Sequence, residues 1–211
     1  MGKYTGSMCR LCRTEGKKLF LKGRRCLSDR CAVEKKNYPP GMKGARVNFR
    51  KSHYKSQLRE KQKVKRFYGV GERQFRNVFA AAAQKKGITG ENLLRNLEMR
   101  LDNVVYRLNF AYSRNHARQM IRHGFFAVNG KKVNVPSYIV ALNDEIGFRE
   151  KKRASEYVKA MLEDVKGLVE IPGWILLDSA NFTAKVNALP TRDDVSLKEI
   201  EERLIVELYS K

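Results

Sequence analysis

All four cysteines of this 211-residue chain lie within its first 31 residues, in the pattern Cys9-x2-Cys12-x13-Cys26-x4-Cys31. Two cysteines separated by two residues can direct both sulfur atoms toward one point, and a second close pair can complete a tetrahedron of thiolates around a metal ion. Gly16 and Gly23 lie between the two pairs, where the chain has to reverse its direction. The spacing therefore predicts an N-terminal knuckle closed by a metal.

The metal that these thiols favour is zinc in a structural site. A catalytic zinc site keeps one coordination position open and usually includes histidine, whereas all three histidines of the chain lie outside the cysteine segment. An iron–sulfur cluster held by the same four cysteines, and buried thiols that bind no metal, are the alternatives that the spacing leaves open.

The cellular compartment also bears on whether the cysteines bind a metal, because cysteines outside the reducing cytoplasm tend to form disulfides. The chain has no apolar run of the roughly 20 residues that span a membrane, and its N-terminus lacks the apolar core of a signal peptide. We therefore expect a cytoplasmic protein with no membrane partner. In that reducing compartment, clustered cysteines are metal ligands more often than disulfides.

The net charge of +22 is concentrated in the N-terminal part of the chain. Residues 1–66 contain 21 basic and 4 acidic side chains, residues 67–142 contain 12 and 4, and residues 143–211 contain 11 and 14. So large a local excess repels itself unless a polyanion neutralises it. We expect nucleic acid to bind the first two thirds of the chain, with an anionic membrane surface as the distant alternative.

Hydrophobic patterning predicts helices through the middle of the chain. A polar, basic segment that contains Pro39-Pro40-Gly41 follows the cysteines and predicts an extended arm. Residues 54–68 predict a helix covered with Lys and Arg, and residues 72–86 predict a second helix with an apolar stripe. Residues 91–108 predict a third helix, because apolar side chains recur on one of its faces.

A short helix and a small sheet are predicted next. Residues 114–123 follow Ser113, a favourable N-cap. Asn129-Gly130 between β-forming residues is typical of a two-residue hairpin turn. Residues 138–150 predict a strand, a turn and a return strand. Beyond them the pattern predicts a polar helix at 150–166, two strands around Ile175 and Val186, and a C-terminal segment that is ambiguous between helix and strand.

One stretch of the chain resembles a known family. Residues 100–140 read RLDNVVYRLNFAYSRNHARQMIRHGFFAVNGKKVNVPSYIV, and they resemble the RNA-binding module of the bacterial small-subunit ribosomal protein S4 family. The resemblance extends to MGKYTG at the N-terminus, YPPG at 38–41, LREKQKVKRFYGVGERQF at 58–75 and ELYSK at 207–211. The four cysteines resemble the zinc-bearing branch of that family.

The resemblance implies a structural constituent of the small ribosomal subunit. Such a protein binds 16S ribosomal RNA at a multi-helix junction of the 5′ domain, nucleates 30S assembly and contributes to translational accuracy. Its implied partners are this RNA and neighbouring small-subunit proteins, notably ribosomal protein S5, with no small-molecule substrate. The alternative is an RNA-binding module protein that acts as a translational repressor or as an accessory to an RNA-modifying enzyme.

The patterns and the resemblance together predict an α+β fold with three parts. Residues 1–45 form the metal-bound knuckle and the extended basic arm. Residues 46–97 form a helical domain that the C-terminal segment 188–211 completes. Residues 98–187 form a small αα-plus-β-sheet RNA-binding module with an extension of its sheet.

The candidate contacts to ribosomal RNA are basic side chains and one serine. Lys and Arg that follow the phosphates give an affinity that falls steeply with salt, while the shape of the RNA junction supplies selectivity. In the module, three arginines recur at every fourth residue and predict a basic stripe beside the buried helix face. The full set is Arg10, Arg13, Arg24, Arg25, Arg30, Arg50, Arg59, Lys61, Lys63, Arg66, Arg100, Arg107, Ser113, Arg114, Arg118, Arg122, Lys131 and Lys132.

Catalysis and DNA regulation are the rival function classes. Neither GxGxxG nor GxxxxGK[ST] occurs in the chain, and the acidic residues after position 143 show no pairing suited to general acid–base chemistry. A zinc finger that reads DNA needs a helix after its metal loop, whereas Pro39-Pro40 follow the cysteines here. We therefore expect a protein without enzymatic activity that binds RNA.

Overall fold

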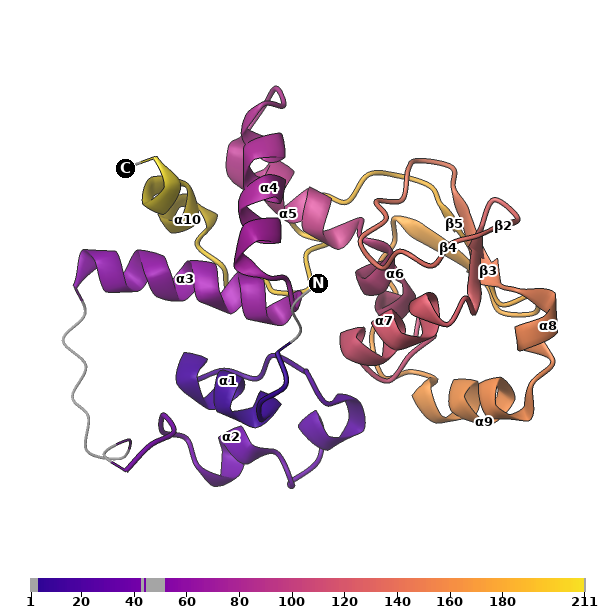
Figure 1. Cartoon of the computed structure of the whole chain (residues 1–211), viewed down its shortest axis with the longest axis horizontal. Helices are drawn as coiled ribbons and strands as arrows, with labels where there is room; N and C mark the ends of the chain where they lie inside the picture. Colours follow the sequence, from indigo (N-terminus) through magenta and orange to yellow (C-terminus); the bar gives the residue numbers. More distant parts are fainter. Residues whose placement is uncertain (1–3, 43, 45–51, 211) are drawn as a thin grey trace. The chain divides into compact units, whose positions relative to one another are not determined.

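The computed structural model describes residues 4–42, 44 and 52–210. The chain divides into two units, one made of residues 1–93 with 197–211 and the other of residues 94–196 (Figure 1). Their boundary falls inside helix α5 (Thr89–Glu98). In the part of the chain that the structure describes, no helix is long and apolar enough to cross a membrane.

The cysteine segment folds into short helical elements. They are α1 (Met8–Glu15), the 3-10 helix η1 (Gly23–Cys26) and α2 (Ala32–Lys35), and α1 packs against α2. Leu19 and Leu21 join the cysteines in a small buried core. Residues 36–42 contain neither helix nor strand, as expected for an arm, while most of the rest of the predicted arm, at 43 and 45–51, lies outside the described residues.

The helical part of the first unit contains the two helices that the sequence predicted. They are α3 (His53–Phe67), which begins where the Ser52 side chain accepts a hydrogen bond from the N–H of Lys55, and α4 (Glu72–Ala83). The C-terminal segment, which the sequence left ambiguous, is helix α10 (Glu202–Tyr209), and it packs along α3. The C-terminal helix is therefore part of the same core as the basic helix.

The second unit contains a five-stranded antiparallel sheet in the order β2-β1-β3-β5-β4. Before the sheet come α6 (Leu101–Arg107) and α7 (Arg114–Arg122). The strands are β1 (Phe126–Val128), β2 (Lys131–Lys132), β3 (Glu145–Phe148), β4 (Ile175–Asp178) and β5 (Thr183–Val186). The order of helices before strands confirms the predicted αα-plus-sheet arrangement.

The turn between β1 and β2 confirms the predicted hairpin. Asn129 and Gly130 both have positive φ, 50° and 75°, and the strands pair Val128 with Lys131. Positive φ at both central positions gives the backbone twist that suits a two-residue hairpin, and it is the reason that asparagine and glycine are favoured there.

The single helix predicted at 91–108 is wrong, because the chain breaks it between α5 and α6. Arg100 stands at the break with an extended backbone, ψ 136°. The N–H of Leu101 donates to the carbonyl oxygen of Tyr138 at 2.8 Å, and the N–H of Val140 donates to that of Met99 at 2.9 Å. These long-range hydrogen bonds replace the helical ones.

Two further predictions are corrected by the structure. The first strand expected in 138–150 is only an isolated bridge between Arg100 and Ile139, and β3 pairs with β1 and β5 instead. The helix expected at 150–166 is divided into α8 (Glu150–Arg153) and α9 (Glu156–Val165). In both places the tertiary structure provides turns that the periodicity of the sequence did not indicate.

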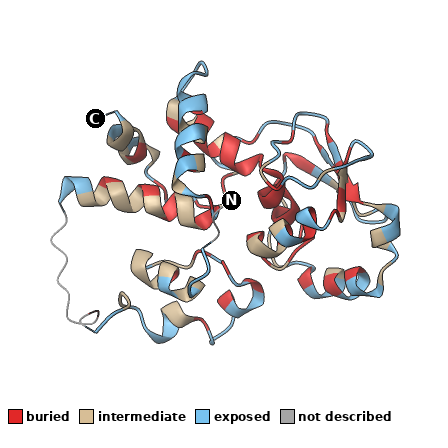
Figure 2. Ribbon diagram, in the orientation of Figure 1, coloured by how far each residue is buried: buried red, intermediate tan, exposed pale blue. Residues whose placement is uncertain are grey.

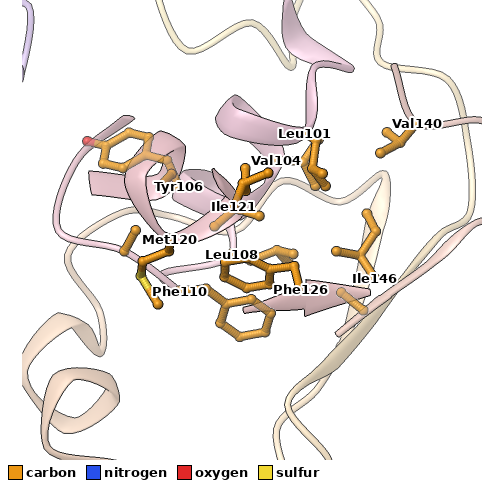
Figure 3. Close-up of a cluster of buried hydrophobic side chains, with 14 of the residues drawn as sticks. Leu101, Val104, Tyr106, Leu108, Phe110, Met120, Ile121, Phe126, Val140 and Ile146 are labelled. Atoms are coloured by element: carbon orange, nitrogen blue, oxygen red, sulfur yellow. The ribbon is translucent and has the colours of Figure 1, made fainter. Parts of the chain in front are cut away.

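Apolar side chains from α6, α7 and the sheet fill one continuous core in the second unit (Figures 2 and 3). The rings of Phe126 and Phe148 lie 4.6 Å apart, and Phe110 packs against both. Leu101, Val104 and Ile121 are fully buried in the same core. This core holds α7 and the β1–β2 hairpin in fixed positions.

Candidate nucleic-acid interface and cysteine cluster

The four cysteines are free thiols, and the sulfur of Cys12 interacts electrostatically with the other three. Cys12, Cys26 and Cys31 are buried, and Cys9 is half-buried. Burial, together with weaker repulsion from the three other sulfurs, raises the pKa of Cys12 to about 11, although a backbone hydrogen bond from Leu19 acts in the opposite direction. The backbone N–H of Lys22 donates to Sγ of Cys26 at 3.3 Å. Without a cation, burial therefore favours the protonated form of the Cys12 and Cys26 thiols.

The cysteine cluster has the donor chemistry of a metal site but not the arrangement of one. Four thiols, with backbone N–H groups donating to two of the sulfurs, are the donor chemistry that a structural zinc site uses. Within the described ranges, however, no three cysteine, histidine, aspartate or glutamate side chains are arranged so that they could hold a metal ion. The metal-bound knuckle predicted from the spacing is therefore not shown, although the cysteines are gathered.

Arg13, a predicted RNA contact, instead fastens the chain that leaves α2. Its Nε donates to the carbonyl oxygens of Tyr38 at 2.9 Å and of Lys36 at 3.2 Å, and its guanidinium lies 4.7 Å from the centre of the Tyr38 ring. The other predicted arginines of the cysteine segment are exposed. They are Arg10, Arg24, Arg25 and Arg30.

On α3, the basic side chains predicted to follow phosphates are bound to carboxylates. Arg59 and Arg66 both donate to Glu15, whose side chain is 1% exposed. Lys61 binds Glu72 at 2.6 Å, and Lys63 binds Glu60. The basic side chains of this helix are thus less available to phosphates than the composition indicated. A composition counts charges but does not show which of them are bound to carboxylates. Arg50 lies outside the described residues.

Three arginines predicted as RNA contacts in the second unit are buried instead. Arg100, Arg107 and Arg114 are 4%, 8% and 5% exposed. Arg100 donates to both carboxylate oxygens of Asp102, at 3.1 and 2.8 Å. Arg107 donates to the Ser196 hydroxyl at 2.6 Å. These three guanidiniums are buried and bound to protein acceptors, so they lie away from the surface that the sequence predicted for them.

Arg114 belongs to a buried polar network that sequence reasoning missed. It donates to the side-chain oxygen of Asn103 at 2.8 Å, and Asn103 in turn donates to Glu98. Glu98 also accepts from the backbone N–H of Ser196 at 3.1 Å. One signal was present: Glu98 lies four residues after Leu94, on the apolar face of its helix, where a charge needs buried partners.

Ser113 has a local structural role. Its hydroxyl accepts the backbone N–H of His116 at 3.3 Å and caps α7, as the sequence predicted for the start of that helix. Burial lowers the pKa of His116, whose Nε2 lies 2.9 Å from the Tyr157 hydroxyl. Since Ser113 is buried, it orders α7 and does not present its hydroxyl at the surface.

Four predicted RNA contacts of the second unit are not buried, and together they form a small basic surface. Arg122, at the end of α7, and Lys131 and Lys132, on β2, are exposed, while Arg118 is half-buried and donates to Asp102 at 2.7 Å. Gly124, with φ +67°, allows the Lys132 side chain to cross the turn after α7, since a Cβ there would lie 2.6 Å from Cε of Lys132. We call these four residues the module surface.

Comparison with known families covers most of the chain. Residues 3–98 match the model of the ribosomal protein S4/S9 N-terminal domain, and residues 99–146 match that of the S4 domain. The chain belongs to the uS4 family of ribosomal proteins. The S4-domain match begins at Met99, next to the break between α5 and α6, and it includes all four residues of the module surface.

Full-length relatives agree with this assignment. The chain is 55% identical to small ribosomal subunit protein uS4A of Alkaliphilus oremlandii over 211 residues, which is 100% of both chains. It is 53% identical to the uS4 protein of Citrifermentans bemidjiense and 51% identical to that of Thermus thermophilus, again over 100% of each chain. Membership of the uS4 family thus applies to the whole chain, including the sheet extension that the two family models do not cover.

Proposed function

We propose that this uS4 chain is a structural constituent of the small ribosomal subunit and binds 16S ribosomal RNA. The observation that carries the proposal is identity of 50% or more over full length with proteins named as small ribosomal subunit protein uS4. Such a protein acts in the cytoplasm, as part of the ribosome. We further propose that it binds the multi-helix junction of the 5′ domain early in 30S assembly, because the resemblance to the family implies this role.

A basic surface in each unit supports the RNA contact. In the second unit, the module surface of Arg118, Arg122, Lys131 and Lys132 contacts phosphates. In the first unit, the exposed arginines of the cysteine segment do so. The buried Arg100, Arg107 and Arg114 hold α6 and α7 in place, and so they act on the RNA only by positioning this surface.

A structural zinc ion is the second part of the proposal. Cys9, Cys12, Cys26 and Cys31 would hold it as thiolates, and the chain would then belong to the zinc-bearing branch of the family. The bound cation supplies the positive charge that lets buried thiols ionise. An iron–sulfur cluster on the same four sulfurs is the alternative. We infer a structural role, because the four ligands would all be cysteines, with no histidine among them.

Family membership supports two further assignments. We expect neighbouring small-subunit proteins, notably ribosomal protein S5, to contact this chain, and we expect variants of it to change the accuracy of translation. We propose no enzymatic activity, because the basic surfaces described above serve to bind RNA and the buried networks serve to order the fold.

Competition binding tests the central proposal. The chain is titrated with a 16S 5′-domain junction fragment and with duplex DNA of equal length at matched salt. We expect at least about tenfold tighter binding to the junction, because shape adds to the phosphate contacts that both polymers share. Equal affinities for the two polymers would overturn the proposed function.

A further inference from the structure

Asp144 is a buried carboxylate that lies outside the module surface. It comes directly before β3 and is 7% exposed, and none of the ion pairs between described residues involves it. A buried carboxylate that pairs with no cation is costly unless hydrogen bonds satisfy its oxygens. The donors from which it accepts therefore show which parts of the fold it holds together.

Each oxygen of the Asp144 carboxylate accepts from a different segment. Oδ1 accepts from Nδ2 of Asn129 at 2.7 Å, and Oδ2 accepts from the backbone N–H of Ala141 at 2.7 Å. The backbone of Asp144 is itself fixed to β5, because its carbonyl oxygen accepts from the N–H of Val186 at 3.0 Å. Hydrogen bonds to a carboxylate are shorter and stronger than those between neutral groups. The carboxylate thus connects the turn after β1 and the loop before β3 to a strand in the interior of the sheet.

Asn129 carries this connection into the hairpin turn. It is the first residue of the turn, with φ 50°, and its backbone N–H donates to the carbonyl oxygen of Glu145 at 2.8 Å. Its side-chain oxygen accepts from the N–H of Glu145 at 2.9 Å. Together with the bond to Asp144, these contacts use both polar atoms of the side chain, so the amide group has one orientation. Three hydrogen bonds therefore attach the turn to the start of β3 and to the residue before it.

Two lysines of the module surface follow this turn directly. Lys131 and Lys132 make up β2, which lies at the edge of the sheet beside β1. Both are exposed, and the ion pairs between described residues include neither of them. A two-stranded hairpin is only marginally stable by itself in water. The position of these lysines consequently depends on what holds the turn in place.

We propose that Asp144 is a positioning residue for RNA binding: it holds the Asn129-Gly130 turn so that Lys131 and Lys132 meet the RNA from a fixed position. The inference rests on the proposed function and adds to it a residue that is itself too buried to touch the RNA. A turn that is already ordered loses less conformational entropy when its lysines bind, and the affinity is higher for that reason. The effect of Asp144 on RNA binding therefore passes through the two lysines.

A matched pair of substitutions tests this role. Asp144→Asn replaces one acceptor oxygen by an NH2 group, which then faces either the Asn129 amide or the N–H of Ala141, so one of the two bonds is lost. Asp178→Asn is the control, because its carboxylate also accepts from an asparagine side chain, that of Asn181, at 2.7 Å. Asp178 ends β4, at the opposite edge of the sheet from β2.

The two substitutions should differ in their effect on RNA affinity. Both remove one negative charge, which by itself would strengthen binding to a polyanion. We nevertheless expect Asp144→Asn to weaken the affinity for the 16S fragment about three- to tenfold, the loss expected when one more side chain has to be ordered on binding. Asp178→Asn should keep the affinity within about twofold. Titration under conditions where circular dichroism shows both variants to be folded provides the measurement, and equal affinities of the two variants would overturn the inference.

The lysines provide the readout that separates positioning from a general structural role. In a chain with Lys131→Gln and Lys132→Gln, Asp144→Asn should have no further effect on RNA affinity, because the groups that it positions are gone. Asn129→Gly deletes the same contact from the turn side and keeps a residue suited to positive φ, so it takes the place of Asp144→Asn if that variant does not fold. A loss of affinity that is the same with and without the two lysines would overturn the inference.

An exchange of the two side chains tests the hydrogen bond itself. Asn129→Asp combined with Asp144→Asn puts the amide donor at position 144 and the carboxylate at position 129, where aspartate is also favoured in a hairpin turn. The bond between the two positions can then form with donor and acceptor reversed, and the net charge is unchanged. We expect RNA affinity within about twofold of that of the unaltered chain. An affinity as low as that of Asp144→Asn alone would overturn the inference.

The two proposals fail in different ways. If the unaltered chain binds the 16S fragment no better than duplex DNA, the proposed function is wrong. If it prefers the fragment but Asp144→Asn binds as tightly as Asp178→Asn, the function stands and the positioning role of Asp144 is wrong.

Discussion

Glu15 binds Arg59 through both of its carboxylate oxygens, with Oε1 2.6 Å from Nη2 and Oε2 3.2 Å from Nε. Arg66, two turns further along α3, donates to the same Oε1. Glu15 ends α1, so this carboxylate fastens the cysteine segment to the basic helix by a contact that involves no cysteine.

Glu15→Gln should therefore destabilise the first unit. The amide cannot accept from two guanidiniums as the carboxylate does, and the site is buried on the Glu15 side. The guanidiniums are 34% and 22% exposed and recover some hydration, so we expect a loss of about 1–3 kcal/mol in the free energy of unfolding. Urea denaturation measures it. Glu199→Gln, which removes an exposed pair with Lys17, is the control and should have a much smaller effect. Equal effects of the two changes would contradict the assigned role of Glu15.

Substitutions of Arg100 and Arg122 should affect stability and RNA binding differently in the second unit. Arg100→Gln leaves Asp102 with one buried guanidinium fewer and should lower the free energy of unfolding by about 2–4 kcal/mol, with RNA affinity of the folded protein changed less than about twofold. Arg122→Gln, at an exposed position, should leave stability within about 0.5 kcal/mol and weaken RNA binding about two- to fivefold. Urea denaturation and RNA titration of both variants provide the measurement. The reverse pattern would show that Arg100 contacts RNA directly.

Gly124 should matter for RNA binding through Lys132. Gly124→Ala adds a Cβ 2.6 Å from Cε of Lys132, at a backbone position with φ +67°. Gly167→Ala is a matched control, because φ there is +74° and no atom lies within 4 Å of the added Cβ. Both changes should cost about 1–2 kcal/mol of stability from backbone strain. Only Gly124→Ala should also weaken binding of the 16S fragment, and equal RNA affinities would show that the position of Lys132 is unimportant.

The lowered pKa of Glu72 predicts that the stability of the fold depends on pH in the acid range. Burial alone would raise its pKa, but hydrogen bonds from Lys61 and Lys65 outweigh burial and lower the pKa from 4.5 to about 2. A pKa that is lower in the folded chain stabilises the fold above the unfolded value, and this stability is lost as pH falls from about 4.5 to about 2.

The test compares the unaltered chain with Glu72→Gln from pH 7 to pH 2. We expect the variant to be less stable by about 1 kcal/mol at pH 7, a modest figure because the side chain is 36% exposed, and the gap should close below pH 4.5. Glu163→Gln, at an exposed position on α9, serves as the control. A gap that stays constant down to pH 2 would contradict the lowered pKa of Glu72.

The cysteine cluster should depend on its metal. We expect about one zinc ion per chain in the purified protein, and Cys9→Ser should release it. Amide hydrogen exchange should then lose protection in residues 8–35 while α3 to α10 keep theirs. Ser7→Ala, at the exposed residue before α1, is the control. If metal content and RNA affinity both survive Cys9→Ser, the structural-zinc proposal is wrong.

Local sequence patterns predicted a large part of this fold, because the signals act over a few residues. The helices α3, α4 and α7 begin and end close to their predicted positions, and the Asn129-Gly130 turn forms the expected hairpin. In each case a cap, an apolar stripe or a residue suited to positive φ specifies the local backbone.

Only the tertiary structure decided which basic residues face solvent. Charge counts marked Arg100, Arg107 and Arg114 as RNA contacts, but their acceptors lie elsewhere, as with Ser196 beside Arg107. The break before Leu101 has the same origin, since hydrogen bonds to residues 136–140 outweigh the helical periodicity. A sequence determines its net charge and its short-range geometry. The pairing of buried charges depends on which distant segments meet, and that is settled by packing of the whole core.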